Sequence, residues 1–273
     1  MSKIVVMPYQ GSKSPIADWI FDNMPSGYRC LVDVCGGGGS VSVNAIARKM
    51  FKVVVYNDLN GDIPNFFRVL RDAPDVLIPK LELTPCSRDE FFGAIDFLAD
   101  KANDDPIERA RCFFVRQVQV MKAFQNEPYW RMSSECDYAS FWNKYPARLL
   151  NIAGLIKEMV IENRDAVRLI ADYDSPSTLF YVDPPYLKEH AVSKYDTDMD
   201  EAAHAKLGAA LSKIEGNALV SGYASSKYDA IYAGWKRVEN NYATSLASGE
   251  ASARVECLWI KNAGHEKQRD MFA

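Results

Sequence analysis

The stretch Cys30-Leu31-Val32-Asp33-Val34-Cys35-Gly36-Gly37-Gly38-Gly39-Ser40 decides the fold of this 273-residue chain. Its first part, residues 30–35, is a short apolar run of the kind that forms a buried strand. Four glycines follow, and they let the backbone approach a ligand closely in front of the free N–H groups of the next helix. This order of strand, glycine turn and helix predicts an α/β fold with a ligand at the turn. A plain tight turn is the alternative for the glycines alone.

Six further short runs repeat the strand pattern. They are residues 52–56, 159–162, 179–182, 218–221, 235–238 and 254–260. Several are apolar throughout, as expected for strands buried on both faces of a mainly parallel sheet. Helix starts alternate with them, at Ser14-Pro15 and at Asp198 with Glu201 three residues later. The predicted fold class is therefore α/β.

Residues 62–158 interrupt this alternation. They contain no convincing strand, but they carry helix-start signals at Ser87, three residues before Glu90, and at Asp105-Pro106, before a helix expected over 107–124. The segment separates the second strand from the third. We therefore expect a helical unit inserted into one α/β domain, which consists of residues 1–61 and 159–273.

Composition is that of an ordinary globular protein, with 48% hydrophobic and 25% charged residues. No apolar run approaches the roughly 18 residues of a membrane-spanning helix, and no secretory signal is recognisable, so we expect a cytoplasmic protein. The six cysteines form no Cys-x-x-Cys pair, which argues against structural zinc and a disulfide framework. A net charge of −4 excludes a protein that coats nucleic acid wholesale, but not one with a local basic groove.

An acidic residue about twenty positions after the glycine turn indicates the class of ligand. Asp58 stands at the end of the second strand, where a carboxylate hydrogen-bonds the hydroxyls of a ribose. The glycine run lacks the lysine of a phosphate-binding loop and the third glycine of a nicotinamide fingerprint, so ATP and NAD fit less well. We predict a nucleoside cofactor. The residues of the turn expected to line its site are Cys35, Gly36, Gly37, Gly38, Gly39 and Ser40.

A second motif, Asp183-Pro184-Pro185-Tyr186, directly follows the apolar strand 179–182. Two successive prolines fix φ and remove two N–H donors, so the carbonyls there are rigid acceptors without local donors. A carboxylate and a carbonyl together accept both hydrogens of an exocyclic amino group, and Tyr186 offers a ring on which a base stacks. The motif predicts an amine-recognition site. A turn after a buried strand is the alternative for the tetrapeptide alone.

Together these motifs resemble those of the Dam-like D12 class of DNA adenine-N6 methyltransferases. The resemblance rests on residues 183–186, on the turn 33–40 and on Pro8-Tyr9-Gln10-Gly11-Ser12-Lys13, and it extends through 221–223 and 254–259. The motifs also follow the order of the family. The resemblance implies a Rossmann-like methyltransferase sheet, mainly parallel with one antiparallel strand near the C-terminus, and a small helical target-recognition domain over 62–158.

The resemblance also implies S-adenosylmethionine as the cofactor and assigns residues to its parts. Tyr9 and Lys13 would bind the methionine carboxylate, Asp33 the methionine amino group and Asp58 the ribose hydroxyls. Asp165 matches the position that accepts from the adenine amino group of the cofactor. From the residues alone, Lys13 is equally an ordinary solvated lysine, and Asp165 is equally the N-cap of a helix over 166–171.

The implied reaction uses a target adenine that leaves the double helix, because N6 cannot be approached inside the base stack. The base would stack on Tyr186 while Asp183 and the Pro184 carbonyl accept the two N6 hydrogens, and the nitrogen would attack the sulfonium methyl group directly. We expect residues 183–186 to be catalytic, with Asp183 also at the cofactor. No metal is expected, and a monomer acting on double-stranded DNA is the default.

The inserted unit departs from the family pattern in residues 118–124, so no target sequence follows from it. The unit holds 13 Lys/Arg and 15 Asp/Glu, and contacts to DNA phosphates must come from local clusters. The residues expected there are Arg109, Arg111, Arg116, Lys122, Arg131 and, beyond the unit, Lys194. A solvated helix face with Arg–acid pairs is the alternative.

Two other functions compete with adenine methylation. An amino methyltransferase of cytosine N4 or of RNA is one, since a pair of acceptors does not specify the base. A DNA-binding module that keeps the fold without catalysis is the other, and the intact motif 183–186 argues against it.

Overall fold

The computed structural model describes residues 3–121, 129–132, 134–187, 199–240 and 255–261. Its centre is a seven-stranded sheet with the order β3-β2-β1-β4-β5-β7-β6. The strands are β1 (Cys30–Asp33), β2 (Val53–Asn57), β3 (Met159–Glu162), β4 (Thr178–Val182), β5 (Asn217–Tyr223), β6 (Lys236–Asn240) and β7 (Glu256–Ile260). Each lies on one of the seven runs predicted from the sequence.

The sheet is mainly parallel, as expected. Strands β1 to β5 pair in parallel, whereas β7 runs antiparallel to both of its neighbours, β5 and β6. The strand order reverses where β1 lies beside β4. In open α/β sheets, ligands bind outside the carboxyl ends of the strands at such a reversal. The site is therefore expected beyond Asp33 and Val182.

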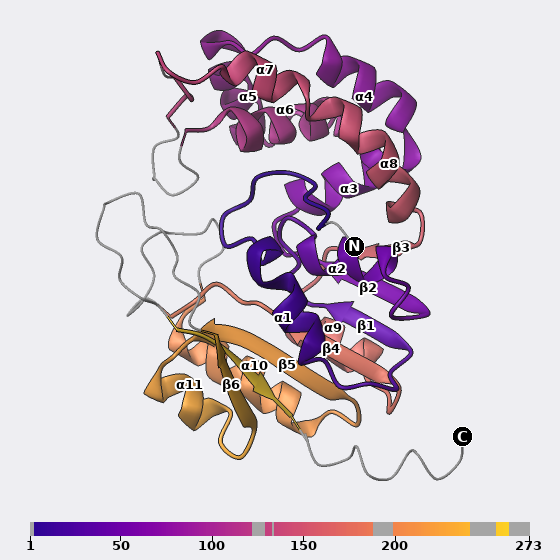
Figure 1. Ribbon diagram of the computed structural model, residues 1–273, viewed down its shortest axis with the longest axis vertical. Coiled ribbons are helices and arrows are strands. Elements are labelled where there is room, and N and C mark those ends of the chain that lie inside the picture. The colour runs from indigo at the N-terminus through magenta and orange to yellow at the C-terminus, as the bar shows by residue number, and fades with distance from the viewer. Residues whose placement is uncertain (1–2, 122–128, 133, 188–198, 241–254, 262–273) are drawn as a thin grey trace.

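Helices cover both faces of the sheet (Figure 1). One face carries α9 (Ala166–Tyr173), α10 (Glu201–Lys213) and α11 (Ser226–Ile231), and the other carries the 3₁₀ turn η1 (Ser14–Ile16), α1 (Ala17–Asp22) and α2 (Ser40–Ala47). Because successive side chains of a strand point to opposite faces, β4 supplies both cores. Leu179 and Tyr181 join one buried cluster, and Phe180 and Val182 join the other.

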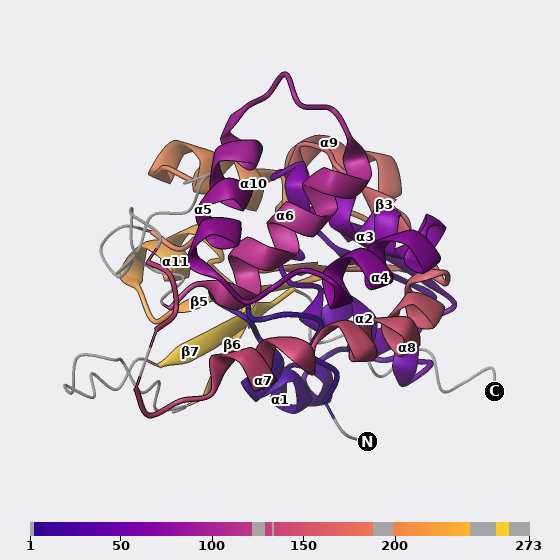
Figure 2. The ribbon, with the colours of Figure 1, turned by 90° about the horizontal axis from the view of Figure 1, so that it is seen from above.

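The segment between β2 and β3 is helical, as predicted. Its helices are α3 (Asp62–Asp72), α4 (Pro74–Glu82), α5 (Arg88–Ala99), α6 (Pro106–Gln119), α7 (Tyr138–Asn143) and α8 (Pro146–Ile156). They gather at one end of the molecule (Figure 1), and α6 lies between α5 and α3 (Figure 2). Phe66 and Phe114 of this unit belong to the same buried cluster as Leu31 and Tyr56 of the sheet. The inserted unit therefore shares its core with the α/β unit.

Side chains cap two of the four predicted helix starts. Ser87 accepts a hydrogen bond from the N–H of Glu90 at the start of α5, and Asp105 accepts from the first N–H groups of α6. Such a cap satisfies N–H groups that have no partner within the helix. Across the described ranges, no helix is long and apolar enough to cross a membrane.

Three helix predictions are wrong in detail. Ser14, the expected N-cap, is the first residue of the turn η1, whose N-cap Lys13 makes no side-chain hydrogen bond. Helix α6 ends at Gln119 instead of continuing to 124, because Val120 adopts an extended conformation and forms an isolated bridge with Trp130. Helix α10 is capped by Asp200, which accepts from the N–H three residues later. The expected cap, Asp198, lies outside the described residues.

Candidate active site

The glycine turn between β1 and α2 is closely surrounded by aromatic side chains. Gly37 and Gly39 have φ values of 49° and 72°, in the left-handed region that favours glycine. A Cβ atom at Gly39 would lie 2.7 Å from the ring of Phe67, and one at Gly37 would lie 2.6 Å from the ring of Tyr9. Backbone conformation and close approach therefore both require glycine here, and the turn brings Tyr9 against the carboxyl end of β1.

Asp58 fastens the end of β2 to this turn. Its Oδ2 accepts from the N–H of Gly37 at 2.9 Å, and its Oδ1 accepts from the N–H of Asn60 at 2.9 Å. Burial raises the pKa of Asp58, although the two backbone hydrogen bonds lower it. The carboxylate predicted to bind a ribose thus lies directly beside the glycine turn.

Asp33, the last residue of β1, is a buried carboxyl group with one unsatisfied oxygen. Its Oδ2 accepts from the hydroxyl of Ser42 at 2.7 Å, whereas its buried Oδ1 has no hydrogen-bond partner among the described residues. Burial raises the pKa of Asp33 to about 7. The negative charge of Asp183 also raises this pKa, whereas the hydrogen bond from Ser42 lowers it. A buried acceptor without a donor is costly, so this atom fits a cationic ligand group such as an ammonium.

Asp183 follows β4, the strand beside β1, and both of its oxygens have partners. Oδ2 lies 2.8 Å from the ammonium of Lys13, and Oδ1 accepts from the hydroxyl of Tyr186 at 3.1 Å. Burial raises the pKa of Asp183, while the positive charge of Lys13 lowers it. The parallel arrangement of β1 and β4 explains why Asp33 and Asp183 meet at one edge of the sheet.

Lys13 is buried, so the solvated lysine considered from the sequence is not what the structure contains. Its ammonium also donates to the carbonyl of Gly11 at 3.0 Å and lies 5.0 Å from the ring centroid of Tyr186. In the absence of a ligand its carboxylate partner is Asp183. Binding of a methionine carboxylate by Lys13 stays a prediction.

Glu256 belongs to the same cluster, although no role was predicted for it. It is the first residue of β7 and lies opposite Tyr223, the last residue of β5. Its Oε1 is 2.5 Å from the hydroxyl of Tyr186 and 3.7 Å from the ammonium of Lys13. Only the antiparallel register of β7 brings it to this edge, and no signal in the sequence sets that register.

The remaining predicted cofactor residues surround the same edge. Ser40 Oγ lies 2.9 Å from Ser12 Oγ, which holds the N-terminal segment on the glycine turn, and burial raises the pKa of the Cys35 thiol well above its ordinary value. Asp165 accepts from the N–H groups of Val167 and Arg168 and so caps α9. This is the second of the two roles considered for Asp165, and its contact with a cofactor stays a prediction.

Comparison with known proteins identifies the family of this site. The sequence matches the D12 class of N6 adenine-specific DNA methyltransferases over residues 9–246, most of the chain. The chain belongs to this class. The type II methyltransferase M.MjaIII of Methanocaldococcus jannaschii is 24% identical over 223 residues, which are 71% of this chain and 75% of that protein.

Solved structures resemble this methyltransferase only distantly. The rRNA methyltransferase aviRa of Streptomyces viridochromogenes matches with 12% identity and a TM-score of 0.37, covering 90% of this chain and 83% of that one. The putative methyltransferase yhhF of Escherichia coli matches with 11% identity and a TM-score of 0.38, covering 93% and 90%.

The protein is thus an enzyme, a DNA methyltransferase specific for adenine N6. Membership of the class implies the use of S-adenosylmethionine and a double-stranded DNA substrate. A function on cytosine N4 or RNA is not favoured. In the part of the methyltransferase that the structure describes, no group of three or more His, Cys, Asp or Glu side chains is arranged to hold a metal ion.

His204 is a further residue that sequence reasoning missed. It is buried on α10, and its Nε2 lies 3.0 Å from the carbonyl oxygen of Pro185 in the motif 183–186. Burial lowers the pKa of His204, which favours the neutral ring with a proton on Nε2 as donor. The ring also meets that of Tyr228 edge-on, with 5.4 Å between centroids. Through His204, helix α10 therefore supports the backbone of the motif 183–186.

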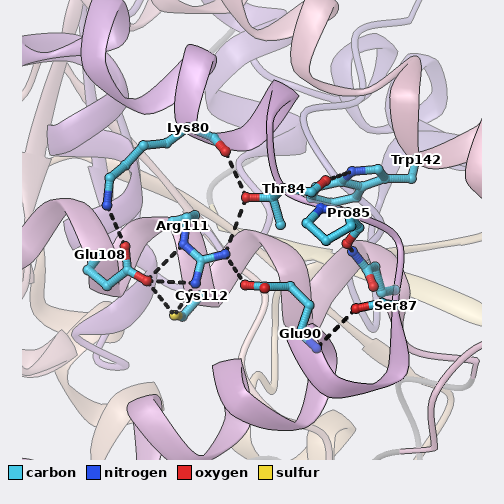
Figure 3. A network of polar contacts seen from close by, with 10 residues as sticks. Lys80, Thr84, Pro85, Ser87, Glu90, Glu108, Arg111, Cys112 and Trp142 are labelled. Atoms are coloured by element: carbon cyan, nitrogen blue, oxygen red, sulfur yellow. Dashed lines mark hydrogen bonds and ion pairs between the residues drawn. The ribbon is translucent and has the colours of Figure 1, made fainter.

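Arg111 lies inside the helical unit of the methyltransferase, in the network that Figure 3 shows. It donates to Glu108 at 2.6 Å and also pairs with Glu90, and its side chain is only 14% exposed. Burial would raise the pKa of Glu108, but hydrogen bonds from Arg111 and Lys80 lower it to about 2. This ion-pair network links α4, α5 and α6.

The other basic residues expected at DNA fall into two groups. Arg109 pairs with Asp62 at 2.5 Å, and Arg131 donates to the carbonyl of Val120 at 3.1 Å and lies over the rings of Tyr138 and Phe141. The Arg109–Asp62 pair is an Arg–acid pair as in the alternative, but it is largely buried and does not lie on a solvated helix face. Arg116 is half-buried on α6. Lys122 and Lys194 lie outside the described residues.

Proposed function

We propose that this methyltransferase transfers the methyl group of S-adenosylmethionine to N6 of an adenine flipped out of double-stranded DNA, with Asp183 as the acceptor of an N6 hydrogen. One observation carries the proposal. Asp183 follows β4 directly at the reversal of strand order, beside the buried and unpaired oxygen of Asp33. An acceptor for the substrate amine and an acceptor for the cofactor ammonium therefore share one edge of the sheet.

The residues at this edge fit the cofactor. The unpaired Oδ1 of Asp33 suits the methionine ammonium, and Asp58 beside the glycine turn suits the ribose hydroxyls. We also place the cofactor against Tyr9, Lys13 and Asp183, against Cys35 and the glycine turn up to Ser40, and near Asp165. When bound, S-adenosylmethionine supplies an electrophilic methyl group on a sulfonium.

The side chains of the catalytic motif prepare the amine. Asp183 and the carbonyl of Pro184 accept the two N6 hydrogens and favour a tetrahedral nitrogen with its lone pair free. Tyr186 provides the ring for stacking of the flipped base. Pro184 and Pro185 fix the backbone between them, and His204 holds the carbonyl of Pro185. Preorganised acceptors of this kind act without rearrangement at the moment of reaction.

The helical unit, residues 62–158, is the proposed target-recognition domain. Arg109, Arg111 and Arg131 have partners inside it. We therefore propose that they stabilise the fold of this unit and do not bind DNA. For Arg116, Lys122 and Lys194, contact with DNA phosphates stays a prediction. The enzyme is expected in the cytoplasm and on DNA as a monomer.

The test is nucleoside mass spectrometry of unmethylated genomic DNA incubated with the enzyme and S-adenosylmethionine. We expect N6-methyladenine with the wild type and a loss of on the order of 10³-fold or more with Asp183→Ala, because an acceptor aimed at the reacting nitrogen is removed. Retained binding of the cofactor, measured by calorimetry, serves as the control for folding, while its affinity can shift because Asp183 also lies at the proposed cofactor site. Normal turnover by Asp183→Ala would refute the mechanism.

A further inference from the structure

Each oxygen of the Asp183 carboxylate already has a donor beside it. Oδ2 is 2.8 Å from the ammonium of Lys13, and Oδ1 accepts from the hydroxyl of Tyr186 at 3.1 Å. The side chain of Asp183 is 16% exposed and that of Lys13 is 10% exposed, so bulk water does not easily replace either partner. An amine that donates to Asp183 therefore competes with Lys13 and Tyr186 for this carboxylate.

Both of these partners have the same second acceptor within reach. The hydroxyl of Tyr186 is 2.5 Å from Oε1 of Glu256, closer than it is to Asp183, and the ammonium of Lys13 is 3.7 Å from the same oxygen. A tyrosine hydroxyl has one proton and donates fully to one carboxylate at a time. A small shift toward Glu256 thus frees both oxygens of Asp183 without leaving a buried donor unpaired.

Electrostatics favour a second acceptor that is charged, in addition to the methionine carboxylate proposed as a partner of Lys13 in the cofactor complex. A buried ammonium that loses its carboxylate partner is strongly destabilised, and the carbonyl of Gly11 is a neutral acceptor. Glu256, whose side chain is 11% exposed, supplies the negative charge that keeps Lys13 paired after it leaves Asp183. With a neutral side chain at position 256, Lys13 would lose one charged partner and would compete more strongly with the substrate for Asp183.

We propose that Glu256 is a positioning residue that receives the Lys13 ammonium and the Tyr186 hydroxyl when the target amino group displaces them from Asp183. The inference rests on the proposed role of Asp183 as the N6 acceptor. The antiparallel strand β7 then contributes a residue to the site, because Glu256, the first residue of β7, lies opposite the end of β5.

The test compares two duplexes that contain the sequence in which the wild-type enzyme methylates adenine. One carries adenine at the target position, and the other carries purine, which lacks the 6-amino group and has nothing to donate to Asp183. We expect Glu256→Gln to lower kcat on adenine by about 10- to 100-fold and to weaken adenine-duplex binding about tenfold, the size of effect expected when one charged hydrogen-bond partner is removed. Binding of the purine duplex and of S-adenosylmethionine should change less than about threefold.

Two further variants make the comparison specific. Glu239→Gln on the neighbouring strand β6 removes an exposed carboxylate that pairs with Arg237. This variant should bind both duplexes with wild-type affinity and keep the wild-type kcat. Glu256→Asp keeps the charge and should recover part of the lost kcat. If Glu256→Gln does not fold, binding of the adenine and purine duplexes is compared with Glu256→Asp instead.

The outcomes separate the two proposals. Equal weakening of both duplexes by Glu256→Gln, or a wild-type kcat, would overturn the role of Glu256, since a structural defect does not distinguish adenine from purine. Asp183→Ala, measured alongside, should reduce the preference for adenine over purine to the part that the Pro184 carbonyl supplies. If Asp183→Ala kept the full preference, the role of Asp183 itself would be wrong. If Asp183→Ala reduced the preference and Glu256→Gln did not, only the inference on Glu256 would fail.

Discussion

At the scale of single residues, Asp33 couples the cofactor site to stability. Its folded pKa of about 7 lies above the unfolded value, so the folded state binds the proton more tightly. The free energy of unfolding therefore falls as pH rises from about 4 to 7 and stays low above that range. Asp33→Asn removes this effect. We expect the melting temperature of the cofactor-free enzyme to rise by on the order of 5 °C at pH 8 and to change little at pH 4.

Thermal unfolding followed by circular dichroism at both pH values checks this. A gain in melting temperature that does not depend on pH would mean that Asp33 is not the titrating group. The same variant should bind S-adenosylmethionine weakly, because it loses the charge that would face the ammonium. Asp165→Asn, which alters an exposed cap, is the control for stability.

Residue positions were predictable where the strand pattern places them. Asp33 and Asp183 both follow parallel strands, and the carboxyl ends of parallel strands meet at one edge. Lys13 comes from a segment before the first strand, and Glu256 from the start of an antiparallel one, so their pairing with Asp183 and Tyr186 depends on tertiary packing. The same holds for Arg111, because a sequence cannot tell an arginine facing DNA from one paired with Glu90 and Glu108.

At the scale of elements, the glycine turn is the most constrained local structure. Gly39 has φ +72°, and a Cβ there would meet the ring of Phe67 at 2.7 Å. We expect Gly39→Ala to lower the free energy of unfolding by about 2–4 kcal/mol, from the left-handed backbone and the steric overlap. Gly93→Ala is the matched control, because Gly93 lies within α5 with nothing within 4 Å of the added carbon.

Urea unfolding measures both changes. Gly93→Ala should raise the free energy of unfolding by roughly 0.5–1 kcal/mol, because alanine has the higher helix propensity. Equal effects at the two positions would show that the turn is not constrained as described. The strands were predicted more reliably than the helix ends, since buried apolar runs are a strong signal. The end of α6 depends on a bridge between Val120 and Trp130. No local sequence pattern predicts this contact.

At the scale of the whole molecule, aromatic rings connect the catalytic sheet with the helical unit. Tyr56 of β2 meets Phe67 with 4.8 Å between ring centroids, Phe67 meets Phe66 at 5.6 Å, and Phe66 stacks on Phe114 at 5.3 Å. Tyr56 also donates through its hydroxyl to the carbonyl of Gly37 in the glycine turn. The sequence predicted a helical segment between the second and third strands, but not that its core continues into the sheet.

This shared core predicts that the two units unfold together. Calorimetry should show one transition, and Phe66→Ala should lower its temperature as a whole, because the loss of about 3–5 kcal/mol of buried contacts affects both units. Leu211→Ala in the cluster on the opposite face is the comparison and should lower the same transition. If the helical unit were independent, Phe66→Ala would split off an early transition and Leu211→Ala would not. Target recognition and methyl transfer would then belong to separately folding parts, which the continuous core argues against.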